Sequence, residues 1–96
     1  MKVVGRNRLQ AFGVQHTDAR DWLNNWLAEV ELASWDTPHD VKAQYASASL
    51  LGKNTVIFNV KGNHYRLEVT IAYQTKVVVV VWVGTHSEYD KRNQNR

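Results

Sequence analysis

Residues 64–73 alternate between larger apolar side chains and mostly polar ones, residues 55–61 do so except at Ile57, and Gly62-Asn63 lies between the two runs. This period of two, together with many β-branched and aromatic residues, predicts two β-strands joined by a two-residue hairpin turn. With that turn, Val60 stands opposite Tyr65 and Phe58 stands opposite Leu67. Opposed residues share a face of the sheet. The expected core face therefore carries Val56, Phe58, Val60, Tyr65, Leu67, Val69, Ile71 and Tyr73.

The opposite face of the same hairpin is polar and basic. It carries Asn59, Lys61, His64, Arg66, Glu68 and Thr70. A half-exposed antiparallel sheet has a solvated face of this kind, so the pattern alone leaves two interpretations open. The face is either ordinary protein surface or a site for an anionic partner.

A third apolar run, Val77 to Val83, predicts a buried central strand, with Gln74-Thr75 as the turn before it. That turn pairs Arg66 with Val83 and Glu68 with Val81. It also places Val77, Val79, Val81 and Val83 on the polar face. Gly84 predicts a sharp exit from the strand, which brings His86, Tyr89 and Lys91 to the rim of that face on an adjustable segment.

The first half of the chain has helical spacing. Val3 and Val4 indicate a short strand, and Leu9 and Phe12 predict a helix over residues 6–16. Thr17 or Asp18 is expected to cap a second helix, whose apolar stripe is Trp22, Leu23, Trp26, Leu27 and Val30. A third helix is expected from the Thr37 cap and Pro38 to Gly52, with Asp40 completing a capping box.

Composition and charge limit the class of protein. The 96 residues suit a single domain over residues 1–96, with a polar tail at about 92–96 expected to fray. There is no cysteine and no apolar run long enough for a membrane helix or a signal peptide, so a cytoplasmic protein is expected. Residues 1–58 contain six Lys or Arg and six Asp or Glu, whereas residues 59–96 contain six and three. The excess positive charge on the sheet half favours a polyanionic partner.

The candidate side chains suit RNA cleavage without a metal. The substrate supplies its own 2′-hydroxyl nucleophile, so the protein needs proton-transfer groups and a cation for the phosphate. His86, with Tyr89 or Lys91, can move protons, and Arg66 can hold the phosphate with two hydrogen bonds. The four histidines show no metal-ligand spacing, so we expect no metal and no other cofactor.

Two blocks of this sequence closely resemble the signature blocks of HigB-type toxins. They are Asn59-Val60-Lys61-Gly62-Asn63-His64-Tyr65-Arg66-Leu67 and Gly84-Thr85-His86-Ser87-Glu88-Tyr89-Asp90-Lys91. Further upstream, Trp35, Pro38, Tyr45 and the segments around His16 and Asp40 also resemble the family. Two positions differ from it: Thr17 stands where relatives often carry Pro, and Val81 stands where they often carry Arg or Lys.

This resemblance implies an α+β fold of the RelE type, with N-terminal helices packed on a small antiparallel sheet. It implies the toxin of a type II toxin–antitoxin pair that cleaves mRNA on the ribosome, and a HigA-type antitoxin with a helix-turn-helix. By matching position, the implied catalytic residues are Arg66, His86, Tyr89 and Lys91, and the implied RNA-binding residues are Asn59, Lys61 and His64. Two alternatives stay open: a non-catalytic module that binds RNA or antitoxin, and an operator-binding regulator, although the acidic second helix is a poor recognition helix.

Overall fold

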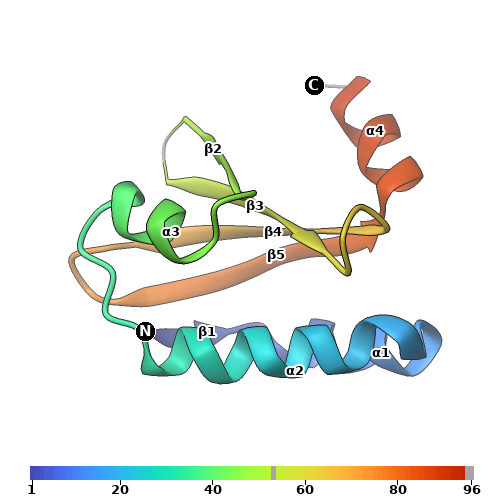
Figure 1. Ribbon diagram of the computed structural model, residues 1–96, viewed down its shortest axis with the longest axis horizontal. Helices are drawn as coiled ribbons and strands as arrows, with labels where there is room; N and C mark the ends of the chain where they lie inside the picture. Colours follow the sequence, from blue (N-terminus) through green and yellow to red (C-terminus); the bar gives the residue numbers. More distant parts are fainter. Residues whose placement is uncertain (53, 95–96) are drawn as a thin grey trace.

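The computed structural model describes residues 1–52 and 54–94. Within them the chain forms five strands and four helices (Figure 1). In chain order these are β1 (Lys2–Val4), α1 (Arg6–Gln15), α2 (Thr17–Leu32), α3 (Pro38–Gln44), β2 (Ser49–Leu51), β3 (Thr55–Val60), β4 (Tyr65–Ala72), β5 (Val77–Thr85) and α4 (His86–Gln94). The expected α+β class is confirmed.

The five strands form one sheet in the order β1-β5-β4-β3-β2. β3, β4 and β5 are antiparallel neighbours, as the sequence predicts. β2, which was not predicted, pairs with β3 in antiparallel, and β1 joins β5 in parallel and makes the sheet mixed. β1 pairs only with Val77 to Val79, so the outer edge of β5 is not paired with β1 beyond Val79. Gly5 turns the chain from β1 into α1 with φ 91°, and a Cβ there would lie 3.0 Å from the Val80 carbonyl oxygen.

The predicted register of the β3–β4 hairpin is confirmed. Val60 pairs with Tyr65, Asn59 with Arg66 and Phe58 with Leu67. The predicted turn is wrong in detail, because a four-residue loop from Lys61 to His64 joins the strands. The left-handed residues are Lys61 (φ 54°) and Gly62 (φ 70°), not Gly62 and Asn63. The register survives because the paired residues keep the same spacing around a longer loop.

The predicted pairing of β4 with β5 is half right. Ala72 pairs with Val77 and Thr70 with Val79, as expected from the Gln74-Thr75 turn. An irregularity at Glu68/Val69 then skips Val81, so Glu68 pairs with Trp82 and Arg66 with Gly84. A bulge of this kind shifts the register by one residue and exchanges the faces beyond it. Val83 consequently packs on the core instead of lying on the polar face.

The helices of the first half follow the predicted pattern with two corrections. α1 lies where it is expected, and α2 carries the expected stripe, with Leu23, Trp26 and Val30 buried. Thr17 is the first residue of α2, not its cap, and the N-cap position is His16. α3 begins with the predicted capping box, in which Asp40 accepts hydrogen bonds from the backbone N–H groups of Asp36 and Thr37.

The predicted end of α3 is wrong. The helix ends at Gln44, and Ser49 to Leu51 form the edge strand β2 instead of a last helical turn. Tyr45 and Ala48 still pack on the core, so the apolar spacing that suggested a helix reflects burial of a looping segment. Gly52 therefore ends a strand and not a helix.

α4 was not predicted, because the sequence suggested an adjustable segment after β5. Thr85 and Glu88 cap it: the Thr85 N–H donates to Glu88 Oε1 at 2.8 Å, and the Glu88 N–H donates to Thr85 Oγ1 at 3.1 Å. This reciprocal pair is the Thr-x-x-Glu capping box. Of the tail at about 92–96 that was expected to fray, residues 92–94 are the last residues of α4. Residues 95–96 lie outside the described residues.

The core lies between the sheet and the helices α1 to α3. Phe58 is its centre on β3, with the Trp26 ring at 5.4 Å and the Tyr45 ring at 5.1 Å, both edge to face. α1 and α2 run along one side of the sheet, and α4 stands on the other side at the end of β5 (Figure 1). Among the described residues, no helix has the length and apolar character needed to cross a membrane.

Candidate functional site

The polar face of β3 and β4 is buried at Arg66 and Glu68 and exposed at Lys61, His64 and Thr70. Arg66 is 9% exposed and Glu68 is 7% exposed. Of the charged residues that the structure describes, these two are the buried ones. The bulge turns Trp82 toward Glu68, and α4 folds back over it, because Arg92 Nη2 lies 3.1 Å from Glu68 Oε1. Buried charged side chains require specific polar partners, so the polar groups at this end of the sheet form an ordered site.

The hairpin loop holds the guanidinium of Arg66. Nη2 donates to Asn63 Oδ1 at 2.5 Å, and Nη1 donates to the Tyr65 carbonyl at 3.0 Å and the Asn63 carbonyl at 3.4 Å. Arg66 is therefore fixed by the backbone and side chain next to it. A phosphate that binds this guanidinium must compete with the Asn63 amide oxygen.

His86 is the first residue of α4 and is fixed at two points. Its backbone N–H donates to the His64 carbonyl at 3.0 Å, which ties the start of α4 to the hairpin loop. Its side-chain Nε2 lies 3.1 Å from Asp90 Oδ2, one helical turn ahead. With Nε2 next to the Asp90 carboxylate, Nδ1 is the ring nitrogen left for proton transfer. The imidazole is 39% exposed, so a substrate can reach it.

Tyr89 and Arg92 hold α4 against the indole of Trp82. The Tyr89 ring centre lies 6.1 Å from that of Trp82, and the Arg92 guanidinium carbon lies 4.8 Å from the indole centre. The indole lies above Gly84, where an added Cβ would come within 2.6 Å of Trp82 Cη2. The expected role of Gly84 as a strand exit is therefore wrong: β5 continues through Thr85, and the glycine leaves room for the indole.

Helical geometry separates Lys91 from the other proton-transfer candidates. His86, Tyr89 and Asp90 are spaced three and four residues apart, so they share one side of α4. Lys91 is two residues from Tyr89 and lies on a different side of the helix. There the hydrogen bond that Glu88 accepts from the Thr85 backbone N–H lowers the pKa of Glu88, and the charge of Lys91 lowers it further.

The three secondary candidates are placed differently. His64 and Lys61 are exposed in the hairpin loop, and His64 is tied to His86 through the backbone. Asn59 stands opposite Arg66 in the register, but its amide donates to the Ser47 carbonyl at 3.4 Å, at the sheet edge. The structure thus gathers Arg66, His64 and His86 at one end of the sheet, whereas the Asn59 amide is hydrogen-bonded to the Ser47 carbonyl.

A second titratable cluster lies behind the hairpin loop. The Tyr65 hydroxyl donates to Asp18 Oδ1 at 2.7 Å, which lowers the pKa of the Asp18 carboxyl and raises that of the phenol. Electrostatic interaction with the nearby His64 and His16 side chains lowers the Asp18 pKa further. The cluster therefore links the start of α2 to the loop that carries His64.

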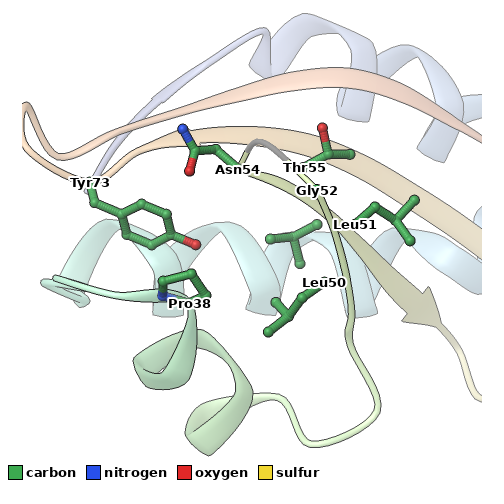
Figure 2. A pocket seen from close by; sticks show the side chains of 8 residues that line it. Pro38, Leu50, Leu51, Gly52, Asn54, Thr55 and Tyr73 are labelled. Atoms are coloured by element: carbon green, nitrogen blue, oxygen red, sulfur yellow. The ribbon is translucent and has the colours of Figure 1, made fainter.

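A separate hollow of about 340 Å³ lies at the far edge of the sheet, between Pro38 of α3 and β2–β3 (Figure 2). Leu50, Leu51 and Tyr73 line it. The Tyr73 hydroxyl is buried and has no hydrogen-bond partner among the described residues, and burial raises the pKa of this phenol. None of the candidate site residues lines this hollow, so it plays no part in the site at the end of β4.

Three residues of this region escaped the sequence analysis: Trp82, Asp90 and Arg92. The bulge hid Trp82, because without it the indole falls on the core face. The spacing His86-x-x-x-Asp90 brings the two side chains together only on a helix, and the signal for that helix is its Thr-x-x-Glu start at Thr85. Among the described residues there is also no group of His, Cys, Asp and Glu placed to hold a metal ion.

Comparison with known protein families matches residues 19–92 to the family HigB_toxin, described as the RelE-like toxic component of a toxin-antitoxin system. No curated protein matches the chain. The matched range contains both sequence blocks discussed above, the strands β3 to β5, and α4 as far as Arg92.

Proposed function

The chain belongs to the HigB_toxin family of RelE-like toxic components of toxin-antitoxin systems, and from this premise we propose that it is an mRNA endoribonuclease. The proposed reaction needs no metal and takes place on translating ribosomes in the cytoplasm. As a toxin of such a system, the protein has an antitoxin partner. We further propose that this partner is a HigA-type protein with a helix-turn-helix.

The observation that carries this proposal is the fixed pairing of His86 with Asp90 beside the loop that holds Arg66. One backbone hydrogen bond, from His86 to His64, joins the two parts of the site. An imidazole oriented by a carboxylate is suited to proton transfer, and a rigid guanidinium is suited to a phosphate. Both groups belong to residues 59–96, the part of the chain that carries the excess positive charge.

Each group has one role in the proposed reaction. His86 Nδ1 removes the proton from the 2′-hydroxyl, and the 2′-oxygen attacks the adjacent phosphorus. The bond to the 5′-oxygen breaks, and the Tyr89 hydroxyl supplies the proton to that leaving oxygen. The products are a 2′,3′-cyclic phosphate and a 5′-hydroxyl. Arg66 stabilises the negative charge that develops on the phosphate oxygens.

The helical positions favour Tyr89 over Lys91 as the partner of His86. Lys91 lies on another side of α4, and we assign it to the RNA backbone. Lys61 and His64, which are exposed on the hairpin loop, are assigned to the same task, with Asn59 at its margin. These contacts position the RNA and do not take part in bond breaking.

The test is single-turnover cleavage of mRNA on programmed ribosomes by the wild type, Arg66→Lys, His86→Ala and Tyr89→Phe, with RNA binding measured alongside. Loss of one proton-transfer group should slow cleavage about 10²- to 10⁴-fold while binding is retained. Arg66→Lys keeps the charge but loses the planar fork, so it should also lose rate. If His86→Ala and Arg66→Lys both cleave at the wild-type rate, the assignment of the site is wrong.

One observation favours a second candidate, a module that binds RNA or antitoxin without cleaving. The guanidinium of Arg66 is buried and already hydrogen-bonded to Asn63. Induced expression with mapping of mRNA ends separates the two functions. New 5′ ends would support cleavage, and intact transcripts together with tight RNA or antitoxin binding would support the module. A helix-turn-helix protein encoded beside this gene that co-purifies with the chain would identify the partner.

A further inference from the structure

A hollow of about 290 Å³ lies between α1 and the last part of β5. Its walls are two aromatic rings, a guanidinium, an amide and two small apolar side chains, contributed by Arg8, Ala11, Phe12, Gln15, Trp82 and Val83. It forms where β1 has ended, since β1 pairs with β5 only as far as Val79. Because β1 is short, the hollow stays open beside Phe12 and Trp82.

Both rings are held in place by neighbours outside the hollow. The Phe12 ring stacks on His16 at 4.2 Å and meets the Tyr65 ring edge to face at 5.4 Å. The Trp82 indole is held by Arg92 at 4.8 Å and lies above Gly84. The hollow is therefore preorganised, and a flat ligand would not have to order these side chains on binding.

The charge around the hollow suits an anionic ligand. The first 17 residues contain no Asp or Glu, and α1 presents Asn7, Arg8, Gln10 and Gln15 on its exposed surface. Arg6 is 3.5 Å from Glu31, whereas Arg8 lines the hollow. Aromatic rings for stacking, an amide for a base edge and a guanidinium for a phosphate are the groups that proteins use to bind single-stranded nucleic acid.

Trp82 connects this hollow to the candidate site. Its indole lies above Gly84, the residue paired with Arg66, and its ring neighbour Tyr89 is one of the proposed proton-transfer groups. An RNA strand whose phosphate lies at Arg66 would thus have a neighbouring nucleotide within reach of Trp82.

We propose that the hollow between α1 and β5 binds one unpaired nucleobase of the substrate RNA, next to the nucleotide that is cut. The base lies between Phe12 and Trp82, Gln15 contacts its edge, and Arg8 contacts its phosphate. This inference rests on the proposed function, because it takes the substrate to be RNA. It adds the position at which the protein recognises a base.

The test uses mRNAs in which one nucleotide at a time around the cleavage point is abasic. For each, kcat/KM is measured on programmed ribosomes with the wild type and with Ala11→Trp, which fills the hollow from the exposed side of α1. The matched control is Val14→Trp, because Val14 is on the same helix, is 77% exposed and does not line the hollow. Thermal unfolding of each variant checks that the fold is kept.

With the wild type, loss of the base at one position should lower kcat/KM about tenfold or more, as expected for one lost base–aromatic stack. Ala11→Trp should lower kcat/KM on intact mRNA by a similar factor and remove the effect of the abasic nucleotide. Val14→Trp should behave as the wild type. Gln15→Ala keeps the hollow but should reduce discrimination between bases at the same position.

The inference is overturned if the wild type cleaves mRNA but every abasic position gives the same rate, or if Ala11→Trp retains the full abasic effect. It is also overturned if Ala11→Trp weakens antitoxin binding and leaves the abasic profile unchanged, because the hollow then belongs to a protein interface. If the wild type neither cuts nor binds any mRNA, the proposed function itself fails, which is a different result from these.

Discussion

Phe58 shows how one side chain supports the fold. It is 1% exposed, it lies on β3, and it contacts rings from α2 and from the end of α3. We expect Phe58→Ala to lower the free energy of unfolding by roughly 3–5 kcal/mol, because the cavity lies where three elements meet. Chemical denaturation measures it. Leu32→Ala, at a residue that is 89% exposed, is the control and should change the value little. A small loss for Phe58→Ala would mean that the core collapses around the gap.

The Asn63 side chain competes with phosphate for the guanidinium of Arg66. Asn63→Asp places a carboxylate where the amide oxygen accepts from Arg66 Nη2. The charge-assisted pair is stronger and competes with phosphate, so we expect weaker RNA binding and slower cleavage with an unchanged fold. Asn63→Ala removes the competitor and is the comparison. If both substitutions weaken RNA binding equally, Asn63 acts through the shape of the loop and not through the guanidinium.

At the scale of the element, α4 depends on its capping box. Thr85→Ala should cost about 0.5–2 kcal/mol, the usual loss for an N-cap. The effect should appear first as fraying of α4, which amide hydrogen exchange detects. Exchange that is faster only in β3 would contradict this role.

The same capping box gives α4 a dependence on pH. Hydrogen bonding to Thr85 lowers the pKa of Glu88 below its ordinary value of 4.5. Its contribution to stability is therefore complete above pH 4.5 and is lost as the pH falls through the lower, folded value. Glu88→Gln should remove this part of the pH dependence. The measurement is the denaturation midpoint of both proteins between about pH 6 and pH 3. Asp18 and Asp40 also have lowered pKa values, so only the difference between the two proteins reports on Glu88.

The elements also show what sequence patterns can and cannot predict here. The β3–β4 register was predictable because the sequence centres the hairpin on Gly62-Asn63, and residues counted outward from that centre stay opposed whether the loop has two or four residues. β2 and the bulge were not, because Ala48 is buried on a loop and a run of five valines, Val77 to Val81, carries no alternation that could reveal a skipped residue. Of the site, Arg66 and His86 were placed correctly at one end of the sheet. Of the groups that hold α4 there, Trp82 could not be placed without the bulge and Arg92 could not be placed without α4.

At the scale of the molecule, α4 is attached to the face of the sheet opposite α1 and α2. The attachment is the ion pair of Arg92 with Glu68, together with packing of Arg92 on Trp82. We expect Arg92→Met to cost roughly 1–2 kcal/mol, less than a fully buried pair because Arg92 is 35% exposed. Cleavage should fall more than stability suggests, since His86 and Tyr89 are on the same helix. Denaturation and single-turnover rates on one preparation compare the two effects.

The Trp82 indole fills the space above Gly84, so no side chain fits at position 84 beside it. This has a consequence for the evolution of the family. We expect a mutation that adds a methyl group at position 84 to be harmful while the indole is present and far better tolerated once it is gone, because then only the flexible Glu88 carboxylate, 3.1 Å from the added Cβ, has to shift. The two positions should therefore covary: relatives with Trp at the position of residue 82 should keep Gly two residues later, and relatives with a smaller side chain there should tolerate Ala or Ser. The order of substitution is also constrained, because a lineage must lose the indole before it can lose the glycine. Gly84→Ala should be deleterious in the wild type and tolerated in a Trp82→Leu background, which makes this historical constraint measurable in one double-mutant cycle.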